Sequence, residues 1–109
     1  MALQCAAELE NKKAIDILLL KLTEVNSYFD YFLIATGNSH IHCKSLAKEL
    51  NNFIKSQNYI VKNHPDLESG WIAIDCFDLI IHIFTEDTRE YYQLEKLWAD
   101  AEIVQLELS

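Results

Sequence analysis

Four short apolar runs, each of strand length, constrain the fold of this chain more than any other feature. They are AIDILLL at 14–20, YFLIAT at 31–36, WIAIDC at 71–76 and LIIHIF at 79–84. Runs in which nearly every residue is apolar are typical of strands covered on both faces, although periodicity alone does not exclude a buried helix. The runs therefore predict a sheet with helices packed on it.

Apolar residues take a helical spacing between the second and the third of these runs. Gly37-Asn38 predicts a turn, and Ser39 predicts the N-cap of a helix that ends near Gln57. Four apolar residues then recur at i, i+4, i+7 and i+8, which is one stripe of an amphipathic helix: Leu46, Leu50, Phe53 and Ile54.

Three further segments fill the gaps between these elements. Alanine, leucine and glutamate favour a first helix at 2–13, and YIVKNH at 59–64 is interpreted as a strand. TEDTREYYQLEKLW at 85–98 predicts a last helix, which Thr85 or Thr88 could cap.

The last two apolar runs are separated only by Phe77-Asp78, which suits a tight hairpin. The order of elements is helix, two strands, long helix, three strands, helix. This order predicts an α/β (α+β) fold, with a mixed sheet of about five strands packed with helices. With two glycines and one proline there is little room for a linker, so we expect a single domain over 1–109.

Acidic residues outnumber basic ones by 17 to 9, which gives a formal net charge of −8. An acidic domain repels phosphate backbones, so direct nucleic-acid binding is not expected as the main activity. The same charge suits a basic protein partner. Solubility alone is the alternative explanation of the charge.

The cysteines and the N-terminal sequence bear on the cellular compartment. Cys5, Cys43 and Cys76 are odd in number and widely spaced, which fits a reducing cytosol better than a disulfide framework. The first ten residues have no basic region and are not expected to form a signal peptide. AIDILLLKL is too short to cross a bilayer. We therefore expect a cytoplasmic protein.

His40, His42 and Cys43 lie within four residues and raise the question of a metal or catalytic site. On a helix the two histidines point about 200° apart, so they cannot chelate one ion without distortion. Neighbouring residues on a helix also rarely face each other, as a Cys/His nucleophile pair must. Cys43 is therefore interpreted as a small buried residue on the inner side of the helix.

A zinc site assembled from His64, Cys76 and His82 remains a weaker alternative, because these residues lack the paired spacing of zinc ligands. His82 lies among bulky apolar residues and is expected to be a hydrogen-bonded core histidine. His64 is expected to be exposed.

Three segments together resemble the Iojap family, whose bacterial members are the ribosomal silencing factors. The family pattern has S-x-x-D-Y-F-[VI]-I-A-T-G-x-S, then W-x-x-x-D-x-x-D-x-[VI]-[VI]-H-x-F-T, then R-x-x-[YF]-x-L-E-x-L-W. The chain departs from it at Ile41, where arginine is usual, and at Phe77, where glycine is common. The resemblance covers about 14–99, and the matching segments are SYFDYFLIATGNSHIHCKSLAKEL, WIAIDCFDLIIHIF and TEDTREYYQLEKLW.

The resemblance implies a nucleotidyltransferase-like fold without the catalytic carboxylates. No D-x-D pair follows Gly37-Asn38-Ser39, and Asp75 and Asp78 are three positions apart. It also implies a translation repressor, active under nutrient limitation and without a cofactor or enzymatic activity. Such a factor binds large-subunit ribosomal protein fourteen and sterically blocks the joining of the small subunit. A homodimer is implied for the free protein.

We expect five residues to contact this partner. Trp71 is the candidate anchor, because tryptophan is over-represented at interface hot spots, although a core tryptophan is the alternative. Of the adjacent Tyr91 and Tyr92, one should be core, and Tyr91 is the expected contact. Three acidic residues would supply complementary charge: Asp66, Glu68 and Asp75.

The alternative function is that of a nucleotidyltransferase-like enzyme. In this hypothesis Asp75, Asp78 and His82 would act with a divalent ion, since two carboxylates on a hairpin could hold one.

Overall fold

In the computed structural model the chain forms three helices and five strands, described for residues 2–22, 30–68, 70–76, 78–93 and 102–104. The elements in chain order are α1 (Ala2–Asn11), β1 (Ile15–Lys21), β2 (Tyr31–Gly37), α2 (His40–Ser56), β3 (Trp71–Asp75), β4 (Leu79–Thr85), α3 (Glu86–Tyr92) and β5 (Glu102–Val104).

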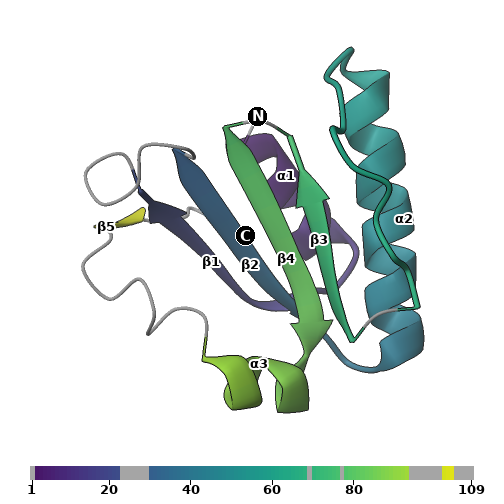
Figure 1. Ribbon diagram of the computed structural model, residues 1–109, viewed down its shortest axis with the longest axis vertical. Helices are drawn as coiled ribbons and strands as arrows, with labels where there is room; N and C mark the ends of the chain where they lie inside the picture. Colours follow the sequence, from purple (N-terminus) through teal and green to yellow (C-terminus); the bar gives the residue numbers. More distant parts are fainter. Residues whose placement is uncertain (1, 23–29, 69, 77, 94–101, 105–109) are drawn as a thin grey trace.

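The five strands make one mixed sheet in the order β3-β4-β2-β1-β5 (Figure 1). The central strands β2 and β4 are parallel, from Tyr31 opposite Leu79 to Gly37 opposite Thr85. The other pairs are antiparallel. β2 and β4 run the same way, so both finish at the same end of the sheet. Helix α3 follows β4 directly and lies at that end (Figure 1). The predicted α+β class with a mixed five-stranded sheet is confirmed.

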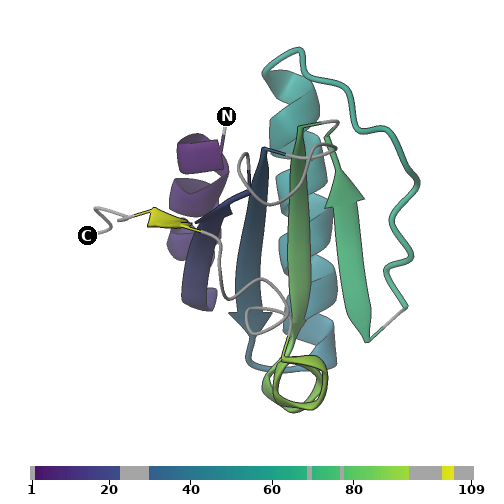
Figure 2. The ribbon, with the colours of Figure 1, turned by 60° about the vertical axis from the view of Figure 1, so that its left-hand side comes forward.

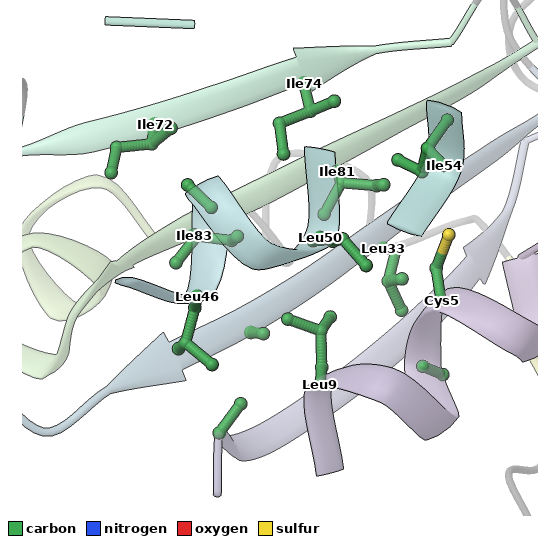
Figure 3. Packing of buried hydrophobic residues seen from close by; sticks show 14 of the residues in the cluster. Cys5, Leu9, Leu33, Leu46, Leu50, Ile54, Ile72, Ile74, Ile81 and Ile83 are labelled. Atoms are coloured by element: carbon green, nitrogen blue, oxygen red, sulfur yellow. The ribbon is translucent and has the colours of Figure 1, made fainter. Parts of the chain in front are cut away.

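Helices α1 and α2 cover one face of the sheet (Figure 2). Alternate residues of the strands point toward these helices, because successive side chains on a strand face opposite sides. Figure 3 shows the resulting core, in which isoleucines of β3 and β4 meet the apolar stripe of α2 and the inner side of α1: Ile72, Ile74, Ile81, Ile83, Leu46, Leu50, Ile54, Cys5 and Leu9.

The other face of the sheet carries a second, smaller cluster of buried residues. Trp71 and Ile80 lie partly buried against it, as does Leu18. Its buried members come from the end of β1, the residue after it and the two central strands: Leu20, Leu22, Phe32, Ile34 and Phe84. Both faces of the central strands are thus apolar, which explains why their sequences are nearly continuous apolar runs.

The predicted strand at 59–64 is wrong, because these residues, all of them described, belong to no strand. Residues 57–68 run along the outer side of β3 (Figure 2), and Lys62 N donates a backbone hydrogen bond to Asp75 O of that strand at 2.7 Å. The side chain of Asn63 takes the place of the backbone hydrogen bonds that a paired strand would make to β3. Its Nδ2 donates to Ala73 O and its Oδ1 accepts from Asp75 N, both at 2.9 Å. The fifth strand is instead β5, in the tail.

The ends of the other elements follow from local chemistry. Thr85 is the N-cap of α3, since its hydroxyl accepts from Thr88 N, which settles the choice between the two threonines. The helix ends at Tyr92 because Gln93 takes a left-handed conformation with φ 48°. The rest of the predicted helix, including Leu94 and Trp98, lies outside the described residues, as does the hairpin residue Phe77. Within the described part of the chain, no helix is long and apolar enough to cross a membrane.

Candidate partner-binding surface

In the histidine cluster at the start of α2, His42 has a structural role. Ser39 caps the helix, since its hydroxyl accepts from His42 N at 3.1 Å. Both ring nitrogens of His42 are engaged: Nδ1 accepts from Asn38 N and Nε2 donates to Lys12 O, each at 2.9 Å. His42 therefore ties the end of α1 to the start of α2 and has no lone pair left for a metal ion. His40 is exposed.

Cys43 is a buried core residue, as predicted, with 2% of its surface exposed. Burial raises the pKa of its thiol, and it raises the pKa of Cys76 to about 11. These thiols stay protonated near neutral pH and are poor nucleophiles. Gly37 is required beside Cys43, because a Cβ at position 37 would lie 2.6 Å from the Cys43 sulfur.

Trp71 begins the edge strand β3 and lies on the face that α1 and α2 leave uncovered. Ile72 and Ile74 point toward the helices and are buried, so Trp71, Ala73 and Asp75 face the other way. The indole Nε1 of Trp71 donates to Nδ1 of His82 at 2.8 Å. Its ring packs against Tyr92, with centroids 4.7 Å apart, and against Phe84 at 5.5 Å.

Tyr91 and Tyr92 extend this contact onto α3. Their rings meet edge to face, with centroids 5.0 Å apart. Tyr91 is 80% exposed and Tyr92 is 48% exposed, and none of the seven residues of α3, all described, is buried. The expectation that one tyrosine is a core residue is therefore wrong. Trp71, Tyr92 and Tyr91 form a continuous run of rings, which we call the aromatic patch.

His82 supports this patch from the neighbouring strand β4. It is 7% exposed, and its ring meets Phe32 edge to face with centroids 4.8 Å apart. Desolvation by burial lowers the pKa of His82 to about 4, so it is neutral at pH 7. The predicted hydrogen bonding of this histidine is present at one ring nitrogen, since Nδ1 accepts from Trp71. The other, Nε2, is buried and has no partner among the described residues.

The three acidic residues predicted as contacts lie in different places. Asp75 shares the face of Trp71 but stands at the far end of β3. Asp66 Oδ1 accepts from Glu68 N at 3.1 Å, which shapes the loop before β3. Glu68 pairs with Lys44 of α2, and this hydrogen bond lowers the pKa of the carboxyl. Of the five predicted residues, Trp71 and Tyr91 are linked through Tyr92, whereas Glu68 is paired with α2 and Asp66 bonds the main chain of Glu68.

The metal-dependent enzyme hypothesis names Asp75, Asp78 and His82. Among the described residues, no group of three or more His, Cys, Asp or Glu side chains could hold a metal ion. The main-chain oxygen of Asp78 accepts from Asp30 N and Tyr31 N at 2.8 and 3.0 Å. Asp78 also lines a cavity of about 650 Å³ at the end of the sheet away from α3, together with Ala2, Leu3, Gln4, Leu19, Tyr31, Tyr59, Leu79 and Val104.

Two structurally important side chains were missed by the reasoning from sequence. Arg89 Nη1 donates to Asp16 O at 2.5 Å and to Thr36 Oγ1 at 2.9 Å, which fixes α3 against β1 and β2. Tyr92 is the ring that contacts Trp71. Both residues belong to the R-x-x-Y part of the family pattern, which was the available signal.

Comparison with known proteins gives consistent similarities. A family model described as "Ribosomal silencing factor during starvation" matches residues 1–109. Ribosomal silencing factor RsfS of Bacillus subtilis is 37% identical over 103 residues, which cover 94% of this chain and 87% of that protein. The mitochondrial assembly of ribosomal large subunit protein 1 of Mus musculus is 32% identical over 95 residues, covering 83% of this chain and 41% of that protein. A crystal structure from Bacillus halodurans superposes with a TM-score of 0.82 at 35% identity, covering 95% of this chain and 96% of that one.

Proposed function

Because this chain belongs to the ribosomal silencing factor family, we propose that it represses translation by binding the large ribosomal subunit under nutrient limitation. In this proposal it contacts ribosomal protein fourteen of that subunit and occupies the surface on which the small subunit would dock. It acts in the cytoplasm by steric exclusion, without catalysis and without a cofactor.

The aromatic patch is the observation that carries this proposal. Trp71, Tyr92 and Tyr91 are in ring contact, and the two tyrosines leave 48% and 80% of their surface exposed. Contiguous exposed aromatic rings are costly to leave in water and are typical of protein interfaces, where Trp and Tyr dominate the binding energy. Each ring combines a large apolar area with a polar end, which suits a surface that is solvated when free.

The charge of the chain supports a basic protein partner. The net charge is −8, and Asp75 lies on the same face of the sheet as Trp71. Acidic groups around an apolar contact would accelerate encounter with a basic surface and fix its register. Asp66 and Glu68 would act from the adjoining loop, with Glu68 contributing less because Lys44 already neutralises it.

A subunit-joining assay tests the proposal. Separated subunits are mixed with excess protein, and joined ribosomes are measured by sedimentation. We expect the protein to block joining and Trp71→Ala to lose this effect. Tyr59→Ala is the matched control, because Tyr59 is 50% exposed but lines the cavity at the opposite end of the sheet. Unimpeded joining at excess wild-type protein would overturn the proposal.

A homodimer is proposed for the free protein. Sedimentation equilibrium at micromolar concentration measures the mass directly, and a single species of 12.7 kDa would refute the dimer.

A further inference from the structure

His82 is a polar side chain in a surrounding that would favour an apolar one. It stands in the middle of β4, on the same face as Ile80 and Phe84, and its ring touches Phe32. Only 7% of its surface is exposed. A leucine or methionine at this position would fill the same apolar space without burying a polar ring.

The hydrogen bond with Trp71 determines the state of this ring. Because Nδ1 accepts from the indole Nε1, the neutral ring carries its proton on Nε2. That N–H is buried and finds no acceptor among the described residues. A buried donor without an acceptor destabilises a fold, and such exceptions in native proteins call for a reason other than stability.

The position of Trp71 suggests that reason. Trp71 starts an edge strand, so it has a neighbouring strand on one side only. Phe84 lies directly opposite it on β4, and His82 precedes Phe84 by two residues on that strand. Phe84 and Tyr92 contact the indole through ring faces and edges, which limits its position but does not select one rotation. The indole has one N–H donor, and that N–H is directed at Nδ1 of His82.

We propose that His82 is a positioning residue for partner binding, which holds the Trp71 indole in its docking orientation by accepting its N–H. This inference rests on the proposed function, because it assumes that Trp71 anchors the partner. Fixing the ring beforehand removes part of the entropy cost of binding. His82 itself is too buried to touch the partner, so its effect passes through Trp71.

Two substitutions of similar size separate this role from a structural one. His82→Gln retains an acceptor for the indole N–H, whereas His82→Leu does not. We expect His82→Leu to weaken binding to purified large subunits about five- to tenfold, the effect of one lost hydrogen bond. We expect His82→Gln to restore most of the affinity. The urea midpoint of His82→Leu should equal or exceed that of the wild type at pH 7. If the leucine variant does not fold, His82→Met takes its place.

A double-mutant cycle and an indole resonance complete the test. On a Trp71→Phe background, which has no indole N–H, His82→Leu should not change affinity further. The Trp71 indole N–H signal, assigned by its loss in Trp71→Phe, should shift and exchange faster in His82→Leu. Wild-type affinity in His82→Leu, with weakened binding in Trp71→Ala, overturns the role of His82 alone. An equal loss of affinity from His82→Leu on the wild-type and Trp71→Phe backgrounds also overturns the role of His82. Wild-type affinity in Trp71→Ala overturns the proposed surface and, with it, this role.

Discussion

Nη1 of Arg89 lies 2.5 Å from the main-chain oxygen of Asp16, which precedes it by 73 residues. Asp16 sits in a bulge of β1 with φ 49°, where the register against β2 shifts between Ile15 and Leu18. The same nitrogen also donates to the hydroxyl of the fully buried Thr36 in β2. One side chain thus joins α3 to two strands and places α3 where Tyr92 can meet Trp71.

Arg89→Ala should destabilise the fold by about 2 kcal/mol, because it removes two hydrogen bonds and leaves the buried Thr36 hydroxyl without its donor. Arg89→Lys should recover only part of this loss, since an ammonium lacks the planar fork of a guanidinium. Urea unfolding followed by circular dichroism measures the change. Lys55→Ala, at an exposed position of α2, is the control and should shift the midpoint little.

His42→Ala should cost roughly 2 kcal/mol of stability, since the imidazole bonds both Asn38 N and Lys12 O. His40→Ala provides a control two residues away, on an exposed side chain. Equal unfolding midpoints for the two variants would contradict the role of His42 as a joint between α1 and α2.

The stability of the wild type should depend on pH through His82. Burial lowers its pKa from 6.5 to about 4, so the unfolded chain takes up the proton more readily than the folded one. The stability of the wild type is therefore highest above pH 6.5 and falls as the pH drops toward 4, because the unfolded chain then binds a proton that the folded chain does not. Relative to His82→Leu, the wild type should lose about 2 kcal/mol of stability between pH 7 and pH 5. A difference that stays constant with pH would show that the ring is not desolvated.

Gly37→Ala should destabilise the protein by about 1–3 kcal/mol, because the new Cβ would stand 2.6 Å from the Cys43 sulfur and 3.0 Å from the Cys43 main-chain nitrogen. Adding Cys43→Ala should recover part of the loss, since it removes the sulfur but not the main-chain contact. Thermal unfolding of the two single variants and the double variant measures this coupling.

Asp75→Lys should slow association with the large subunit several-fold at low salt, because charge near a contact acts mainly on the rate of encounter. The effect should shrink as added salt screens it. Glu68→Gln should have a smaller effect, since Lys44 already neutralises that carboxylate. Association rates at two ionic strengths decide the matter, and a salt-independent deficit in Asp75→Lys would argue against charge steering.

The sheet was largely predictable from sequence, because its central strands are buried on both faces and so consist of unbroken apolar runs. The prediction of a strand at residues 59–64 failed for a physical reason. Their β-branched and aromatic residues suit a strand, but Asn63 satisfies the edge of β3 with its side chain instead of its backbone. β5 has only three residues and pairs with β1 at the other edge, too short a segment to leave a pattern in the sequence.

The candidate surface was predictable only in part. Trp71 could be selected by residue type, but its partner Tyr92 is 21 positions away on α3, which Arg89 ties to β1 and β2. His42 is bonded to the end of α1 whereas His40 is exposed, and the difference depends on whether an acceptor lies within reach of the ring. Nothing in the local sequence records that distance.

The amide of Asn63 has a consequence for how copies of this protein behave toward one another. An uncovered strand at the border of a sheet is a template on which another extended chain can assemble. By occupying Ala73 O and Asp75 N, this one side chain withholds adhesive main-chain groups at that border. A second copy that paired its backbone with this border would first have to displace both of these hydrogen bonds.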